Sequence, residues 1–551
     1  MRNVPYPILQ TLSLLKEHQF TDIIAVQDRH TLPFIQAALC VPSFKMHLNA
    51  NALSAGYEAL GMALEKGNGV AMAVSETVLP LIQGALEQAR SQGVSILLLS
   101  LREGAEPSGV PSASPFPAVT LERNAPKDSP EAIRNNLKIN SAILETRHRG
   151  KGPSILRIQT QSASALSKEQ AFELPDERVI DRLEGLDGYQ QDPAPAIRKL
   201  SSLRRRMVIV GQMNCIYAFN RRVRLLLDKQ FCWVAEQSSN ATLPTDEPIM
   251  RMDEILYPLT QEELDRLSPE LVITIGKVGL SRRLRYFLTR HKPVEHWHVD
   301  SRGELRDDFQ GVLSLSIEMD PFEFLEKIAE HIEDIPSSYP GSWKQLQKAL
   351  PVPELDVWCE TSVIGRTIQS LPRGCSLHLS GGSVAEAAGM FSLPKGMEVL
   401  SSKDLGVRNG ALLTMVSYAR CSERLNFLLI GDMGALMDLP LLSGPLPSNA
   451  RILVVNNSGS QQMAALPSLD KDLDEQWTER LTLRHDQSLE IWAQRAGAEY
   501  LTAYDADSLK NALEVLTDQE MSRRGVIVEA RTDLETDRTF LKEHLKSLKR
   551  P

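Results

Sequence analysis

Short apolar runs alternate with longer amphipathic stretches along the whole chain. In the first third of the sequence the apolar runs cover residues 22–27, 69–75 and 95–101, and the amphipathic stretch ALSAGYEALGMALEKG separates the first two. A continuous run of apolar β-forming residues is typical of a strand that is buried on both faces of a sheet. Long helical connections allow such strands to pair in parallel. The pattern therefore predicts an α/β protein with parallel sheets between layers of helices.

The same alternation recurs twice further along the chain. The later apolar runs cover residues 207–212, 232–236, 271–276, 296–299, 375–381, 426–432, 451–457 and 525–530. Polar stretches rich in Pro, Gly and Asp, at about 168–204 and 333–356, divide the runs into three groups and are typical of linkers. The sequence thus predicts three successive parallel-sheet α/β domains at 1–185, 200–335 and 355–551.

Composition and charge narrow the class of protein. The 551 residues include 61 Lys and Arg against 70 Asp and Glu, a net charge of −9. An acidic chain is not expected to bind nucleic acid or an anionic membrane, since both require clustered positive charge. No apolar stretch reaches the roughly 18 residues of a membrane span, and the N-terminal residues do not form a signal peptide. Six isolated cysteines fit reduced thiols. We expect a cytoplasmic protein.

The most informative motif lies in the last third of the chain. The apolar run NFLLI ends at Gly431 and Asp432, and the run RILVV ends twenty-five positions later at Asn457, shortly before Gly459. Ligands of open parallel sheets bind beyond the carboxyl ends of the strands. A carboxylate, an amide oxygen and a loop carbonyl suit Mg²⁺, and glycines let a diphosphate approach the backbone. The alternative is a plain turn at Gly-Asp and a strand-end cap at Asn-Asn.

This spacing, in a three-domain α/β chain, resembles that of the thiamine-diphosphate enzymes. More narrowly, residues 269–310 and the segments GDMGALMDL and VVNNSGSQQM are similar to the MenD branch, which makes 2-succinyl-5-enolpyruvyl-6-hydroxy-3-cyclohexene-1-carboxylate for menaquinone. The resemblance covers nearly the whole chain. It implies thiamine diphosphate and Mg²⁺ as cofactors and a homodimer or tetramer. It also implies Asp432, Asn457 and the carbonyl of Gly459 as Mg²⁺ ligands, with Gly431 in the cofactor site.

Four arginines match positions at which the family binds acidic substrates. Arg29 lies in QDRHTLP, Arg102 follows the run SILLLSL, and Arg282 and Arg283 form a basic pair after the run LVITIG. The resemblance implies that they face 2-oxoglutarate and isochorismate, since a guanidinium pairs bidentately with a carboxylate. The alternative for each is an ordinary surface arginine.

Several positions depart from the family pattern around the cofactor. Ala52 stands where the superfamily has the Glu that exchanges a proton with the aminopyrimidine, and Glu58, six positions later, falls on another helix face. By ungapped counting, Arg408 replaces the apolar residue that holds the cofactor in its V shape. Glu76 replaces a glycine, and Glu386 or Ala387 takes the position of a substrate-binding arginine.

The sequence alone therefore leaves two functions open. One is a MenD-type synthase that decarboxylates 2-oxoglutarate and adds the resulting unit to isochorismate. The other is a catalytically inactive MenD-like paralogue that acts as a binding or regulatory protein.

His296 and His298 occupy alternate positions of one predicted strand. Because no third ligand has suitable spacing, we interpret them as core histidines and not as a metal pair.

Overall fold

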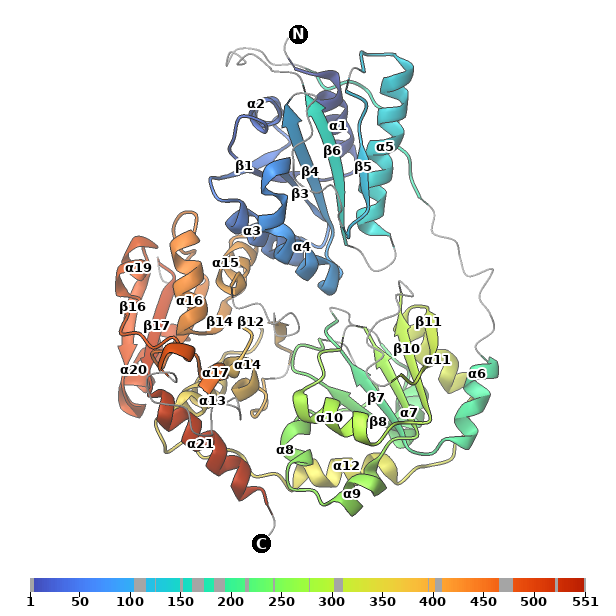
Figure 1. The fold of residues 1–551 in the computed structure, drawn as a ribbon, viewed down its shortest axis with the longest axis vertical. Coiled ribbons are helices and arrows are strands. Elements are labelled where there is room, and N and C mark those ends of the chain that lie inside the picture. The colour runs from blue at the N-terminus through green and yellow to red at the C-terminus, as the bar shows by residue number, and fades with distance from the viewer. Residues whose placement is uncertain are drawn as a thin grey trace. The chain divides into compact units, whose positions relative to one another are not determined.

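The computed structural model shows three parallel sheets, each covered by helices (Figure 1). It describes residues 4–103, 115–123, 125–148, 152–160, 173–182, 194–213, 218–240, 243–276, 278–301, 311–394, 396–401, 409–464, 479–520 and 524–549. The predicted α/β fold class with successive parallel sheets is confirmed. Each predicted domain span contains one sheet, while the domain boundaries themselves stay a prediction.

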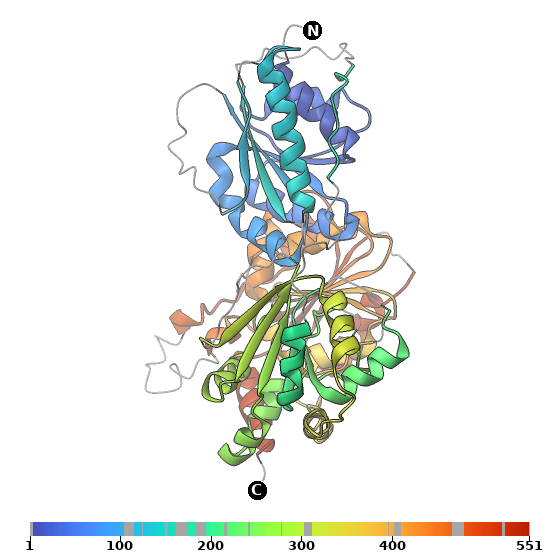
Figure 2. The ribbon, with the colours of Figure 1, turned by 90° about the vertical axis from the view of Figure 1, so that its right-hand side faces the viewer.

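The first sheet has six parallel strands, and both of its faces are buried. In sheet order the strands are β2 (Lys45–Asn49), β1 (Asp22–Val26), β3 (Val70–Ser75), β4 (Ile96–Glu103), β6 (Pro153–Thr160) and β5 (Ala118–Thr120). Successive side chains of β1 belong to two different cores, Ile23 to one and Ile24 to the other. One core contains α1 (Tyr6–Glu17), α2 (Leu32–Leu39) and α5 (Pro130–Arg147), and the other contains α3 (Ala52–Lys66) and α4 (Leu79–Gln92). Figure 2 shows α5 lying along one face of this sheet.

The middle sheet has five parallel strands. In sheet order they are β11 (Leu313–Glu318), β10 (Glu295–Asp300), β9 (Leu271–Ile275), β7 (Arg206–Val210) and β8 (Phe231–Ala235). The accompanying helices are α6 (Ala194–Lys199), α7 (Arg221–Gln230), α8 (Met252–Leu256), α9 (Gln261–Leu267), α10 (Arg282–Arg290), α11 (Pro321–His331) and α12 (Tyr339–Lys348). The stretch 333–356, expected as a linker, contains α12. Its Trp343 is fully buried in the core of this sheet, because so large an aromatic side chain gains by leaving water.

The two histidines of β10 lie in the interior of the middle sheet. His296 and His298 are both buried, and each has a ring nitrogen within 3.0 Å of the Thr274 hydroxyl. A shared hydroxyl partner on the neighbouring strand is the environment of histidines that belong to a core.

The third sheet has six parallel strands and includes the candidate motif. In sheet order they are β13 (Glu398–Ser401), β12 (Ser376–Leu379), β14 (Asn426–Gly431), β15 (Ala450–Asn456), β17 (Val526–Arg531) and β16 (Glu499–Ala503). The helices in this part of the chain are α13 (Glu360–Ser370), α14 (Ser383–Ala388), α15 (Ala411–Cys421), α16 (Asp432–Asp438), α17 (Gln461–Ala464), α19 (Glu490–Arg495), α20 (Ala506–Leu516) and α21 (Leu534–Ser547). Residues of α13, α14 and α20 form one apolar core with this sheet.

The chain divides into two compact units. Unit 1 contains Met1–Gly185, Asn409–Glu423 and Met437–Pro447, and unit 2 contains Leu186–Arg408, Arg424–Leu436 and Ser448–Pro551. Within unit 1, α15 packs against α3 (Figure 1). Gly61 of α3 permits this packing, because a Cβ atom there would lie 2.1 Å from the carbonyl oxygen of Thr414. No helix within the described ranges is long and apolar enough to cross a bilayer.

Candidate functional site

The predicted metal-site residues come together at one edge of the third sheet, within unit 2. Gly431 ends β14, Asp432 opens α16, and Asn457 directly follows β15. Because β14 and β15 pair in parallel, their carboxyl ends lie at the same edge. The backbone N–H of Gly459 donates a hydrogen bond of 3.0 Å to the Asp432 carboxylate. The structure thus places Gly431, Asp432, Asn457 and Gly459 close together, and their roles as ligands stay a prediction.

The turn after β15 has a conformation that few residues adopt. Ser458 has a φ of 60°, in the left-handed region, and its N–H donates to Asn456 Oδ1 at 3.0 Å. Gly459 passes close to a neighbouring loop, and a Cβ atom there would lie 3.0 Å from the Thr482 carbonyl oxygen. The sequence Asn-Asn-Ser-Gly therefore builds a tight turn that brings a backbone N–H to Asp432.

The side chain of Asn457 is buried and satisfied at one end only. Its Nδ2 donates to Asp537 Oδ2 at 3.0 Å, whereas its Oδ1 is buried and has no hydrogen-bond donor among the described residues. A buried carbonyl oxygen without a donor is costly unless another electropositive group reaches it. This oxygen and the buried carboxylate of Asp432 follow two paired strands, and oxygens of this kind suit a hard cation such as Mg²⁺.

His485 is a site residue that the sequence did not predict. Its Nε2 lies 3.0 Å from Asp432 Oδ2, and this hydrogen bond raises the pKa of His485. No group of three or more His, Cys, Asp or Glu side chains within the described ranges is arranged to hold a metal ion. A cation at this edge would therefore depend on one carboxylate together with amide and carbonyl oxygens.

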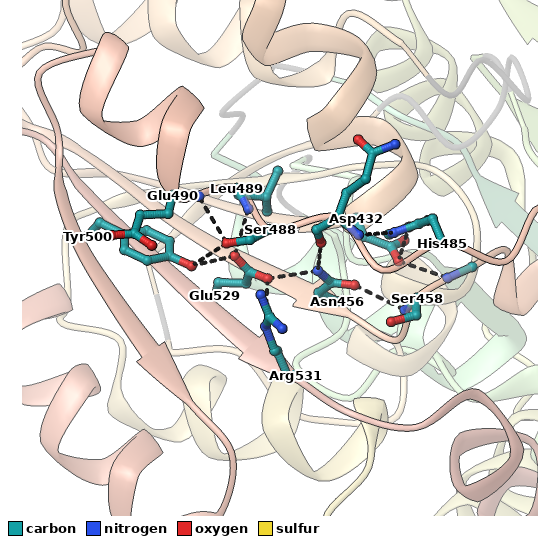
Figure 3. A network of polar contacts seen from close by, with 12 residues as sticks. Asp432, Asn456, Ser458, His485, Ser488, Leu489, Glu490, Tyr500, Glu529 and Arg531 are labelled. Atoms are coloured by element: carbon teal, nitrogen blue, oxygen red, sulfur yellow. Dashed lines mark hydrogen bonds and ion pairs between the residues drawn. The ribbon is translucent and has the colours of Figure 1, made fainter.

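A buried glutamate of β17 holds the surrounding loops (Figure 3). Glu529 accepts hydrogen bonds from Asn456 Nδ2 at 2.7 Å, the Leu489 N–H at 3.0 Å, the Tyr500 hydroxyl at 2.6 Å and Arg531 Nε at 3.0 Å. It therefore links the turn after β15 to the loop that carries His485. Glu529 was not among the predicted site residues, although a carboxylate inside the apolar run 525–530 is an anomaly that could have identified it.

Two further carboxyl groups are buried in unit 2, and one of them, that of Asp537, contacts Asn457. Asp537 Oδ1 accepts the N–H of Glu360 at 2.7 Å, and Glu360 Oε1 accepts the Ser383 hydroxyl at 2.8 Å. Burial raises the pKa of both carboxyl groups, and the proximity of Asp537 raises the pKa of Glu360 further. Neither residue has a sequence signal, because α13 and α21 are far apart along the chain.

Ala52, predicted to stand at the position of the family's proton-relay glutamate, lies in unit 1 and offers no titratable group. Ala52 is the first residue of α3, after the capping residue Asn51, and its methyl group is buried. Glu58 is directed elsewhere, because its carboxylate accepts from Asn49 Nδ2 at 3.0 Å and from the Ser443 hydroxyl, and it pairs with Arg420. Glu58 is therefore engaged with the α15 side of unit 1, in line with its predicted face.

The candidate substrate arginines have different surroundings in the two units. In unit 1, Arg102 Nη1 lies 3.3 Å from Glu76 Oε2, and Arg157 Nε lies 3.9 Å from the other oxygen of the same carboxylate. Arg29, also in unit 1, is exposed.

In unit 2, Arg282 and Arg283 open α10, and the guanidinium of Arg283 lies over the Tyr257 ring at 4.5 Å. Arg408 lies outside the described residues. The predicted substrate roles of the arginines stay a prediction.

Comparisons with known proteins identify the family. No family model matches the chain. The chain is 36% identical to 2-succinyl-5-enolpyruvyl-6-hydroxy-3-cyclohexene-1-carboxylate synthase of Bacteroides fragilis over 98% of this chain and 99% of that protein, and 34% identical to the Phocaeicola vulgatus synthase over 98% of each. The chain belongs to this synthase family. The resemblance to the MenD branch is therefore confirmed.

Solved structures support the fold of this MenD-family chain. A thiamine diphosphate-dependent 4-hydroxybenzoylformate decarboxylase of Rhodococcus jostii RHA1 matches with a TM-score of 0.63 at 14% identity, covering 96% of this chain and 99% of that chain. Benzoylformate decarboxylase from Polynucleobacter necessarius matches with a TM-score of 0.65 at 13% identity, covering 97% and 99%. The MenD-family chain thus has the fold of the thiamine-diphosphate decarboxylases.

Proposed function

We propose that this MenD-family protein binds thiamine diphosphate with Mg²⁺ and catalyses the family reaction. In that reaction 2-oxoglutarate is decarboxylated and the resulting four-carbon unit is added to isochorismate, in menaquinone biosynthesis. The observation that carries the proposal is the near full-length similarity to curated synthases. As part of the same proposal, the protein is a cytoplasmic homodimer or tetramer.

The geometry of unit 2 supports the cofactor part of the proposal. The carboxylate of Asp432 and the unsatisfied Oδ1 of Asn457 would hold the cation, with the carbonyl of Gly459 as a third oxygen. When bound, thiamine diphosphate supplies the electron sink that decarboxylation of a 2-oxo acid requires. The chain's own contribution at this edge is to fix the oxygens that bind the cation.

A non-catalytic binding protein is the second candidate, and Ala52 favours it. A methyl group can neither accept nor donate a proton, so the residues at this position do not fit the cofactor's aminopyrimidine as the family's glutamate does. The pairing of Arg102 with Glu76 points the same way, because an arginine already neutralised by a carboxylate of the chain binds an acidic substrate less strongly.

Calorimetry followed by a product assay separates the two candidates. We expect the full-length protein to bind thiamine diphosphate in the presence of Mg²⁺, and Asp432→Asn to weaken this binding more than about tenfold. Asp486→Asn is a matched control, because it removes the same charge from an exposed position beside His485. Product formed from 2-oxoglutarate and isochorismate would establish the synthase. Binding without product would favour the second candidate, and no heat at millimolar cofactor would refute cofactor binding.

A further inference from the structure

The amide of Asn457 can face the candidate cation site in two ways. With its oxygen directed to the site it can bind a cation, whereas with its NH₂ group directed there it repels one. The carbonyl oxygen and the NH₂ group are almost equal in size, so packing alone does not choose between the two orientations. The choice depends on the hydrogen-bond partner at the other end of the amide.

That partner is the buried carboxylate of Asp537, on the C-terminal helix α21. An ionised carboxylate only accepts hydrogen bonds, so it faces the NH₂ group of Asn457, at 3.0 Å. Asp537 is itself fixed, because its Oδ1 accepts the Glu360 N–H at 2.7 Å and its Oδ2 also accepts the Thr532 hydroxyl at 3.0 Å. The carboxylate therefore holds the Asn457 oxygen on the opposite side, where no described group donates to it.

We propose that Asp537 is a positioning residue for the cation, which acts by orienting the side-chain carbonyl of Asn457 toward it. This inference rests on the proposed cofactor binding in unit 2 and adds a residue outside the predicted ligand set. It assigns α21 a role in the site, although α21 is far from Asp432 and Asn457 along the sequence.

Asp537→Asn tests the inference, because the new amide cannot reproduce the carboxylate. The oxygen of the new asparagine has to keep accepting from the Glu360 N–H, because an NH₂ group there would place two donors opposite each other. The NH₂ group at position 537 therefore faces Asn457. The Asn457 amide then turns over and presents its own NH₂ group to the cation. We expect Mn²⁺, used in place of Mg²⁺ with thiamine diphosphate and followed by the EPR signal of the free ion, to bind about 10- to 100-fold more weakly.

The exchanged pair Asn457→Asp with Asp537→Asn is the decisive variant. In it the amide at 537 donates to the carboxylate at 457, which keeps a second oxygen for the cation. We expect this double variant to recover most of the Mn²⁺ affinity that Asp537→Asn loses. Asp533→Asn is the matched control, because it removes the same charge from the start of α21 while asparagine still caps the helix, and its affinity should equal that of the wild type.

The outcomes distinguish the inference from the proposed function. Wild-type protein that binds no Mn²⁺ with millimolar thiamine diphosphate would overturn both. Wild-type binding with an unchanged Asp537→Asn variant would overturn the role of Asp537 alone. A weakened Asp537→Asn variant without recovery in the exchanged pair would show a merely structural role, and would equally overturn the inference. Circular-dichroism melting of each variant without metal checks that it is folded.

Discussion

The substitution Glu529→Gln tests whether one buried carboxylate organises the loops of the metal edge. Glu529 is fully buried in β17, and it accepts four hydrogen bonds (Figure 3). Two donors reach each of its oxygens, Asn456 and Arg531 on one side and the Leu489 N–H and Tyr500 on the other. Glutamine keeps the shape of the side chain but replaces one acceptor oxygen by a donor. The new NH₂ group therefore meets a donor on whichever side it faces.

The expected loss of stability follows from these contacts. If the NH₂ group faces Leu489, Tyr500 can rotate its hydroxyl to accept, but the Leu489 N–H is left buried without an acceptor, at a cost of about 1–3 kcal/mol. The remaining bonds lose the extra strength that a charged acceptor gives, roughly 1 kcal/mol in total. The free energy of unfolding of unit 2 should therefore fall by about 2–4 kcal/mol.

Thermal unfolding measures this change, with an exposed glutamate as the reference. At about 2–4 °C per kcal/mol, the melting temperature of Glu529→Gln should fall by roughly 5–15 °C. Glu499→Gln, on the neighbouring strand β16, makes the same chemical change at an exposed position, and its melting temperature should equal that of the wild type. We also expect weaker Mn²⁺ binding by Glu529→Gln, since the Asn456 turn loses its anchor. A melting temperature within about 1 °C of the wild type would refute the organising role of this carboxylate.

Two further predictions concern unit 1. Glu76→Gln removes the carboxylate that pairs with Arg102. A partly exposed ion pair contributes about 1 kcal/mol, so calorimetry should show 2-oxoglutarate binding about fivefold more tightly to this variant. Unchanged affinity would argue against a substrate role of Arg102. Burial tends to raise the pKa of Asp22, but His47 and Lys66 outweigh it and lower the pKa to about 2. Because this folded-state pKa lies below the unfolded value, the stabilisation is present above about pH 4 and lost toward pH 2. The unfolding free-energy difference between wild type and Asp22→Asn, about 1–2 kcal/mol, should therefore shrink as the pH falls from about 4 toward 2 in urea titrations.

The sequence predicts the interior strands well because burial on both faces leaves a continuous apolar run. The runs 22–27, 207–212 and 451–457 correspond to β1, β7 and β15 within one residue at each end, apart from the carboxyl end of the second run. Most strands at the sheet edges escape such a reading, although the run 232–236 matches the edge strand β8. The strands β2, β11, β13 and β16 each form one edge of a sheet, and polar side chains interrupt their apolar positions. The pattern therefore finds most of the central strands, with β6 as an exception, and few of the edge strands.

The candidate site likewise contains some residues whose meeting the sequence predicts and others whose meeting it does not predict. Asp432 and Asn457 follow two neighbouring strands, so their spacing predicts that they meet. His485 and Asp537 reach the same edge from a loop and from the C-terminal helix. Their positions depend on how the helices pack, which no periodicity encodes.

The predicted cofactor residues of unit 2 and the predicted relay position of unit 1 differ in their effect on the stability of the fold. In unit 2 the buried Asn457 oxygen without a donor destabilises the protein by about 1–3 kcal/mol, and the charge of Glu529 requires four donors to be tolerated. A site that bound nothing would gain nothing from leaving this buried oxygen without a donor. In unit 1 the methyl group of Ala52 carries no such cost and no such chemistry. The proposed cation binding in unit 2 and the predicted relay position in unit 1 thus depend on different residues. The buried Asn457 oxygen without a donor among the described residues argues for a bound cation whether or not Ala52 permits turnover.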